Sequence, residues 1–170
     1  NGLITINLLE ADSVERERQR IALNEPYRTL LGHFRHEAGH FYENVLVEDT
    51  GRRGAFRAVF GDETASYSEA IEAYYADGPK PDWQEAYVTA YATMHPWEDF
   101  AETWAHYLHM VDTLDTGAGF GLTVNPRMAA DPRDAAALDF DPYDPPAFSS
   151  LVAAWLPLTE AVKSLNRSMG

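Results

Sequence analysis

The chain contains no cysteine among its 170 residues. Disulfide bonds, thiolate metal sites and cysteine nucleophiles are therefore excluded, and any bound metal must use histidine and carboxylate ligands. A chain without cysteine is stable in reducing and in oxidising surroundings, so this absence leaves the compartment open. No signal-peptide pattern opens the chain, which favours a cytoplasmic location. The first residue is Asn1 and not methionine, and we expect a fragment or a processed product.

Basic residues and long apolar runs are also scarce. The 13 lysines and arginines stand against 27 acidic residues, which gives a formal net charge of −14. Nucleic acids and anionic membranes bind basic surfaces, so we expect neither as a partner. No apolar run approaches the roughly 18 residues that a membrane span needs. The acidity favours neutral or basic substrates, although solubility alone also explains a charge of this sign.

The rest of the composition is that of an ordinary globular protein, with 45% hydrophobic residues. We predict a single domain over residues 1–170, because this length is enough for one core. The predicted fold class is α+β, predominantly helical with a small sheet. Two segments suggest the sheet, a β-branched strand at residues 2–9 and a short strand or link at residues 55–60.

Capping and breaking signals locate the helices. Ser66 and Glu69 form a capping-box pattern at the start of one helix, and Gly78 ends it. Further helices are expected over residues 14–23, 27–47, 82–91, 95–114 and 148–166, the last kinked at Pro157. Residues 115–146 are rich in glycine, aspartate and proline and are expected to be irregular.

The sequence His36-Glu37-Ala38-Gly39-His40 lies within the helix expected over residues 27–47. Each helical residue advances by about 100°, so His36 and His40 lie on one side, one turn apart. Two imidazoles in this arrangement can bind one zinc ion. Glu37 lies beside them, as a general base acting on a zinc-activated water would. The motif therefore predicts a zinc site with catalytic character.

The apolar residues of this helix fall on the opposite side; they are Leu31, Phe34, Ala38, Phe41 and Val45. We predict that the helix packs on the core with this side and leaves the histidine side for function. Gly32 and Gly39 flank the histidine side, where the close approach of another segment would explain them. His33 also lies there, either as a fourth metal-side group or as an exposed or backbone-bonded residue.

A catalytic zinc site needs a third protein ligand, and the helix expected over residues 95–114 offers candidates. Glu98 and Glu102 lie one turn apart, opposite the apolar side of that helix. One of them can bind zinc while the other accepts the N–H of a ligating histidine. His106 is a further candidate for the third ligand. The alternative without function is a pair of surface glutamates.

Tyr91 lies seven residues before Glu98, where its hydroxyl could stabilise the oxyanion of a tetrahedral intermediate. A purely structural role, in which Tyr91 packs in the core, is an equally good explanation for this tyrosine. His95, His106 and His109 are weaker candidates for oxyanion binding or proton transfer, and a structural role is the alternative for each.

Two long segments resemble a known family: GHFRHEAGHFYENVL, which starts at Gly32, and HPWEDFAETWAHYLHMVDTLDT, which starts at His95. They are similar to a bacterial family of zinc-binding metallopeptidases of the gluzincin type, whose longer members place a zinc ribbon before this domain. The second segment is similar, more remotely, to the zinc site of anthrax lethal factor. The present sequence has no zinc ribbon, which puts the completeness of the substrate cleft in doubt.

The resemblance implies a zincin-like domain with two active-site helices and one Zn²⁺ ion. It implies His36, His40 and Glu98 as zinc ligands and Glu37 as the general base. It also implies Glu102 as the partner of a ligating histidine and Tyr91 as the active-site tyrosine.

These features together predict zinc-dependent hydrolysis of peptide bonds in a peptide or protein substrate. One alternative is a catalytically silent, zinc-containing module that binds a protein. Another is a zinc hydrolase that acts on a different bond. By analogy with gluzincins, the strand at residues 2–9 would bind an extended substrate along its edge.

Overall fold

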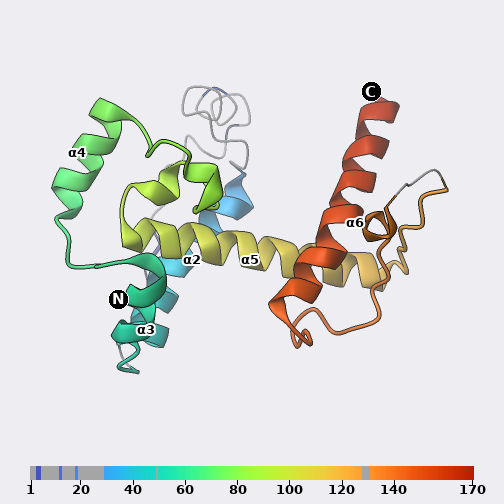
Figure 1. Ribbon diagram of the computed structural model, residues 1–170, viewed down its shortest axis with the longest axis horizontal. Coiled ribbons are helices and arrows are strands. Elements are labelled where there is room, and N and C mark those ends of the chain that lie inside the picture. The colour runs from blue at the N-terminus through green and yellow to red at the C-terminus, as the bar shows by residue number, and fades with distance from the viewer. Residues whose placement is uncertain (1–2, 5–11, 13–17, 19–28, 49, 128–130) are drawn as a thin grey trace. The chain divides into compact units, whose positions relative to one another are not determined.

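The computed structural model describes residues 3–4, 12, 18, 29–48, 50–127 and 131–170. Helices dominate this part of the chain (Figure 1). In order they are α2 (Leu30–Glu43), the π-helical turn η2 (Asn44–Glu48), α3 (Arg53–Phe60), α4 (Tyr67–Asp77), the 3₁₀ turns η3 (Trp83–Glu85) and η4 (Tyr91–Thr93), α5 (Pro96–Gly119), the 3₁₀ turn η5 (Pro132–Asp134) and α6 (Phe148–Met169). None of these helices is both long and apolar enough to cross a membrane.

The prediction of a small sheet is wrong for the residues that the structure describes. They contain an isolated bridge between Val124 and Ala136 but no strand. Residues 55–60 belong to α3, because Phe56 and Phe60 lie one turn apart and both rings pack against Phe100. A short apolar run does not distinguish a strand from a buried helix, so the sequence of residues 55–60 alone could not predict this helix.

Two further predictions fall outside the described residues. The strand at residues 2–9, with its proposed role in substrate binding, lies there except for Leu3 and Ile4, which have no regular structure. The helix at residues 14–23 lies there except for Arg18.

The helix start predicted from the capping-box pattern is confirmed, with Ser66 as the N-cap residue. The backbone N–H of Glu69 donates to the Ser66 hydroxyl, and α4 begins at Tyr67. The helix ends before Gly78, whose φ of 81° is a conformation that glycine adopts without strain. A side-chain cap and a glycine stop therefore located this helix correctly from the sequence.

The other boundaries are partly confirmed. The helix α5 begins at Pro96 as predicted but extends to Gly119, beyond the expected end at residue 114. The helix α6 begins at Phe148 and contains Pro157. The helix expected over residues 82–91 is wrong, because only the short turns η3 and η4 form in that region.

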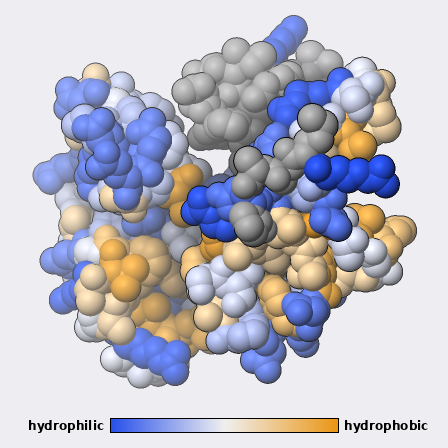
Figure 2. Space-filling model, turned by 45° about the vertical axis from the view of Figure 1, so that its right-hand side comes forward, coloured by the Kyte–Doolittle hydropathy of each residue, from blue (hydrophilic) through white to orange (hydrophobic). Residues whose placement is uncertain are grey.

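The helix α2 packs with its histidine side, and not with its apolar side as predicted. Its buried residues are Gly32, Gly39 and Glu43. Leu31 and Phe34 on the apolar side are 57% and 46% exposed. Large apolar side chains remain at the surface elsewhere too, as the orange areas of Figure 2 show. The side of α2 that bears the functional groups is therefore also the side that meets its neighbour.

The backbones of α2 and α5 come close together at Gly39. A Cβ atom at this position would lie 2.9 Å from Ala101 Cα and 3.2 Å from Trp104 Cβ. Ala101 and Ala105 on α5 are buried. The two helices thus meet where both carry small side chains, as the sequence analysis expected for Gly39, and this contact fixes the separation of their functional groups.

We expect Gly39→Ala to destabilise the protein by about 1–2 kcal/mol. The methyl group overpacks the contact with Ala101, which costs about 1–3 kcal/mol, and the better helix propensity of alanine offsets up to about 1 kcal/mol. Denaturant unfolding of the metal-free protein measures the change. The matched control is Gly54→Ala in α3, where a Cβ meets nothing within 4 Å. Equal stability of the two variants would contradict a tight contact at Gly39.

The chain divides into two compact units, Asn1–His106 and Tyr107–Gly170. The second unit has its own core, in which the side chains of α5 and α6 pack together; its buried members are Val111, Leu114, Leu151, Ala154 and Leu158. Because α5 contributes to both units, each unit uses a different part of this helix. The single domain predicted over residues 1–170 stays a prediction.

Candidate metal centre

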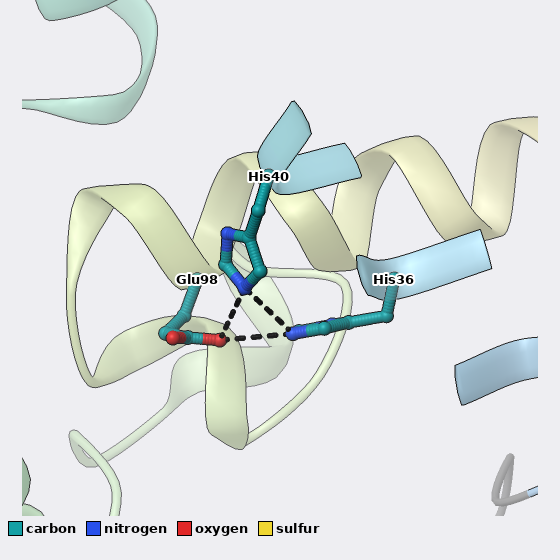
Figure 3. Close-up of side chains that lie close together, drawn as sticks. All are labelled: His36, His40 and Glu98. Atoms are coloured by element: carbon teal, nitrogen blue, oxygen red, sulfur yellow. Dashed lines mark hydrogen bonds and ion pairs between the residues drawn. The ribbon is translucent and has the colours of Figure 1, made fainter. Parts of the chain in front are cut away.

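Three side chains from α2 and α5 meet in the first unit (Figure 3). His36 Nε2 lies 3.0 Å from Glu98 Oε2, and His40 Nε2 lies 3.6 Å from the same oxygen. The two Nε2 atoms are 3.1 Å apart. His36 and His40 occupy successive turns of α2, and Glu98 lies in the first turn of α5. We call these residues the His–His–Glu group.

The His–His–Glu group fits a divalent cation. Glu98 is 2% exposed. Its buried Oε2 lies close to two imidazole nitrogens but accepts no hydrogen bond of regular geometry. A tetrahedral zinc ion with bonds of about 2.0–2.2 Å separates its ligand atoms by about 3.3–3.6 Å. The separations between the three atoms of the group are close to these values, and two nitrogens with one oxygen form a donor set that zinc favours.

In the His–His–Glu group, the attraction between opposite charges outweighs the effect of burial on the pKa values of His36 and Glu98. Burial disfavours the charged form of His36, but its interactions with Glu102 and Glu98 outweigh this effect and raise its pKa to about 10. Burial also disfavours ionised Glu98, but interactions with His36 and His40 lower its pKa to about 2. Because a metal ligand must be a neutral imidazole, a metal ion that binds here would displace the proton of His36.

Glu102 lies behind His36. Its Oε1 is 2.6 Å from His36 Nδ1, and this contact orients the ring so that Nε2 faces Glu98. The sequence left Glu98, Glu102 and His106 open as the third ligand. Of these, the structure brings Glu98 into the group, while His106 Nδ1 donates to the backbone oxygen of Glu102 at 2.9 Å.

Glu37 lies on the neighbouring side of α2, where it pairs with His33. His33 Nε2 is 3.2 Å from Glu37 Oε1. This hydrogen bond lowers the pKa of Glu37 and outweighs the opposing effect of burial. Glu37 is therefore ionised, and His33 contacts both this candidate base and the edge of the His36 ring.

Tyr91 lies in η4, with its ring centroid 6.2 Å from that of His36. Burial and the charge of Glu98 raise the pKa of Tyr91 above its usual range, so its hydroxyl remains protonated. Oxyanion binding and core packing were equal alternatives for Tyr91, and in the structure it lines the same cleft as His36.

Tyr67 is a residue of this site that the sequence analysis missed. Its hydroxyl donates to Glu98 Oε1 at 2.9 Å, which leaves Oε2 to face the two histidines. Tyr67 is the first residue of α4, and no motif distinguishes it from the other tyrosines of the chain. Only the folded positions of α4 and α5 reveal this contact.

We expect Tyr67→Phe to weaken zinc binding by about 10–100-fold, the usual cost of losing a group that orients a metal ligand. The phenyl ring retains the packing of Tyr67 against His95 and Trp97, so only the hydroxyl contact is lost. Competition with a zinc chelator measures the affinity. Tyr87→Phe is a control, because Tyr87 bonds to Lys80 instead of Glu98. Unchanged affinity in Tyr67→Phe would show that Glu98 needs no such support.

Two other candidate histidines have partners elsewhere. His95 Nε2 donates to the backbone oxygen of Ala65, and its Nδ1 accepts from the N–H of Trp97, both at 3.1 Å. These contacts connect the start of α5 to the segment before α4. His109 belongs to the second unit, where its ring contacts Trp155.

The candidate site opens onto a cleft of about 630 Å³ in the first unit. Glu37 and Tyr91 line this cleft together with the His–His–Glu group and Glu102. Its volume lies in the range typical of sites that bind small molecules or side chains. A group of side chains that could hold a metal ion, an ionised carboxylate and a protonated tyrosine thus line one accessible space.

Residues 1–170 match a protein family described as "Putative zinc-binding metallo-peptidase". Similar chains occur in Mycobacterium tuberculosis (the uncharacterized proteins Rv2568c and MT2644) and in Mycobacterium bovis (the uncharacterized protein Mb2598c). Each is 46% identical over 171 residues, which cover 100% of this chain and 48% of the relative. The chain therefore spans about half the length of the curated relatives it matches. No solved structure matches the chain.

Proposed function

Because the chain belongs to the family of zinc-binding metallopeptidases, as its sequence resemblance predicted, we propose that its first unit hydrolyses peptide bonds with one zinc ion bound by His36, His40 and Glu98. The observation that carries this proposal is the convergence of two Nε2 atoms and a buried carboxylate oxygen at one point of the cleft. Zinc bound there supplies Lewis acidity towards a carbonyl and towards water, whose pKa it lowers to about 7.

Glu37 is the proposed general base. Its carboxylate lines the cleft beside the His–His–Glu group, and His33 keeps it ionised. In this form it accepts a proton from the attacking water and can pass that proton to the leaving amine. Its contact with His33 also holds the carboxylate in place.

Tyr91 is the proposed oxyanion donor. Its raised pKa keeps the proton on the hydroxyl, so the group is a donor throughout the physiological pH range. A hydrogen bond from this hydroxyl to the developing oxyanion of the substrate strengthens as negative charge grows, which favours the transition state. Glu102 is the proposed partner that keeps His36 oriented.

Removal and return of zinc test the proposal. We expect the chelator-treated protein to hydrolyse no unstructured protein substrate, and one equivalent of zinc per chain to restore hydrolysis. Zinc at 100 times its Kd should also stabilise the fold by about 2.7 kcal/mol, because it binds only the native state. Elemental analysis and thermal unfolding give the two readouts. Failure to bind zinc would refute the proposed site, whereas bound zinc without hydrolysis would favour the silent protein-binding module.

A further inference from the structure

The helix α4 contains no buried residue. Its tyrosines nevertheless share a cleft with the His–His–Glu group, because Tyr67, Tyr74 and Tyr75 all line it. Tyr75 is 66% exposed, and the ring of Tyr74 meets the edge of Tyr91 at a centroid distance of 5.7 Å. A surface helix normally buries its apolar side against the core. Here the aromatic side of α4 faces the cleft.

The segment between α4 and α5 extends this aromatic lining. Trp83 in η3 is half-buried, and Val88 is 45% exposed. Both line the same cleft as Tyr74 and Tyr75. We call the three aromatic residues Tyr74, Tyr75 and Trp83, together with the neighbouring Val88, the aromatic wall. These four residues come from one continuous stretch of chain, whereas the His–His–Glu group comes from α2 and α5.

Apart from the histidines and the proposed zinc ion, the cleft offers no cation to an acidic side chain, because none of the described residues that line it is lysine or arginine. Each lining glutamate already interacts with a histidine: Glu37 with His33, Glu98 with His36 and His40, and Glu102 with His36. The attraction left for a basic side chain is therefore small.

We propose that the aromatic wall is a substrate subsite that binds a large apolar or aromatic side chain of the peptide, close to the bond that is cut. This inference rests on the proposed peptidase function of the same cleft. Burial of one such side chain against exposed rings removes apolar surface from water on both partners. The presence or absence of such an apolar side chain in a substrate changes binding or kcat/KM by about 10–100-fold.

The first experiment measures selectivity in binding and in cleavage separately. Peptides that differ only in one residue, which is Phe, Ser, Lys or Glu, are presented at each position around the cut bond. Binding is measured by calorimetry on the zinc-loaded Glu37→Gln variant, and kcat/KM is measured on the unchanged protein. We expect the Phe peptide to exceed the Ser, Lys and Glu peptides by about 10–100-fold at one position.

Three outcomes of this experiment have distinct meanings. Preference for Lys would show that the rings bind a cation through their faces and would overturn the proposal. Equal treatment of all four peptides, or no binding of any of them, would also overturn it. Selective binding of the Phe peptide without cleavage would support the subsite and refute the proposed hydrolysis, so the two proposals can fail independently.

The second experiment removes parts of the wall. Tyr75→Ala and Trp83→Ala should each lower the ratio of kcat/KM for the Phe peptide to kcat/KM for the Ser peptide by about 10-fold. Tyr143→Ala is the matched control, since Tyr143 is 62% exposed in the second unit and does not line the cleft. An equal loss for both peptides would show a structural role for the wall and would overturn the inference.

Discussion

Replacement of Glu37 by glutamine is expected to leave zinc bound and to lower kcat by about 10²–10⁴-fold. This range is the usual contribution of a general base, and glutamine has the shape of glutamate but cannot accept the proton. Zinc binding should persist because Glu37 is not a member of the His–His–Glu group. Elemental analysis of zinc and turnover of an unstructured protein substrate measure the two effects.

The matched control for Glu37→Gln is Glu72→Gln, an exposed glutamate on α4 that does not line the cleft. It should retain both zinc and activity. Full activity in Glu37→Gln would remove Glu37 from the mechanism. Loss of zinc in the same variant would show instead that Glu37 belongs to the metal site.

The second large effect is expected from Glu98→Gln, which should lower zinc affinity by about 10²–10³-fold. Zinc sites with four protein ligands have binding free energies of about 10–16 kcal/mol, so one ligand contributes about 2.5–4 kcal/mol. Glutamine retains the shape and an oxygen that can accept from Tyr67, but it loses the negative charge next to the histidines. Chelator competition gives the affinity, and circular dichroism of the metal-free form checks the fold.

Glu102→Gln separates the two glutamates of α5. Glu102 contacts His36 Nδ1 and not the point where the group converges, so we expect a smaller loss of about 10–100-fold. Glu98→Ala and Glu102→Ala repeat the comparison without an amide that could bind metal. The reverse order of the two losses would identify Glu102 as the ligand and would require a different arrangement of α5.

Local signals predicted the elements that carry the site but not the way they pack. The spacing of His36 and His40 and the start of α5 at Pro96 follow from helix periodicity and capping, which act within one or two turns. The choice between Glu98 and Glu102 depends on the rotation of α5 relative to α2. That rotation is set by the contact at Gly39 and Ala101, which lie 62 positions apart along the chain.

The packing side of α2 shows why periodicity was insufficient. An apolar side is expected to be buried, yet Leu31 is exposed while Gly39 and Glu43 are buried. Small residues such as Gly39 allow two backbones to approach. This effect depends on a partner that a helical-wheel argument does not include. Tyr67 was missed for the same reason, because its importance arises only from contact with Glu98.

The lack of buried residues in α4 has a consequence for protein engineering. This helix is only 11 residues long, and its exposed positions are not constrained by a core. The proposed selectivity can therefore be redesigned by exchanging α4 as a cassette, provided that Ser66 and Tyr67 are retained at its start. The two helices that carry the candidate metal ligands would remain untouched. A library restricted to this stretch would search for new cleavage preferences at little risk to folding.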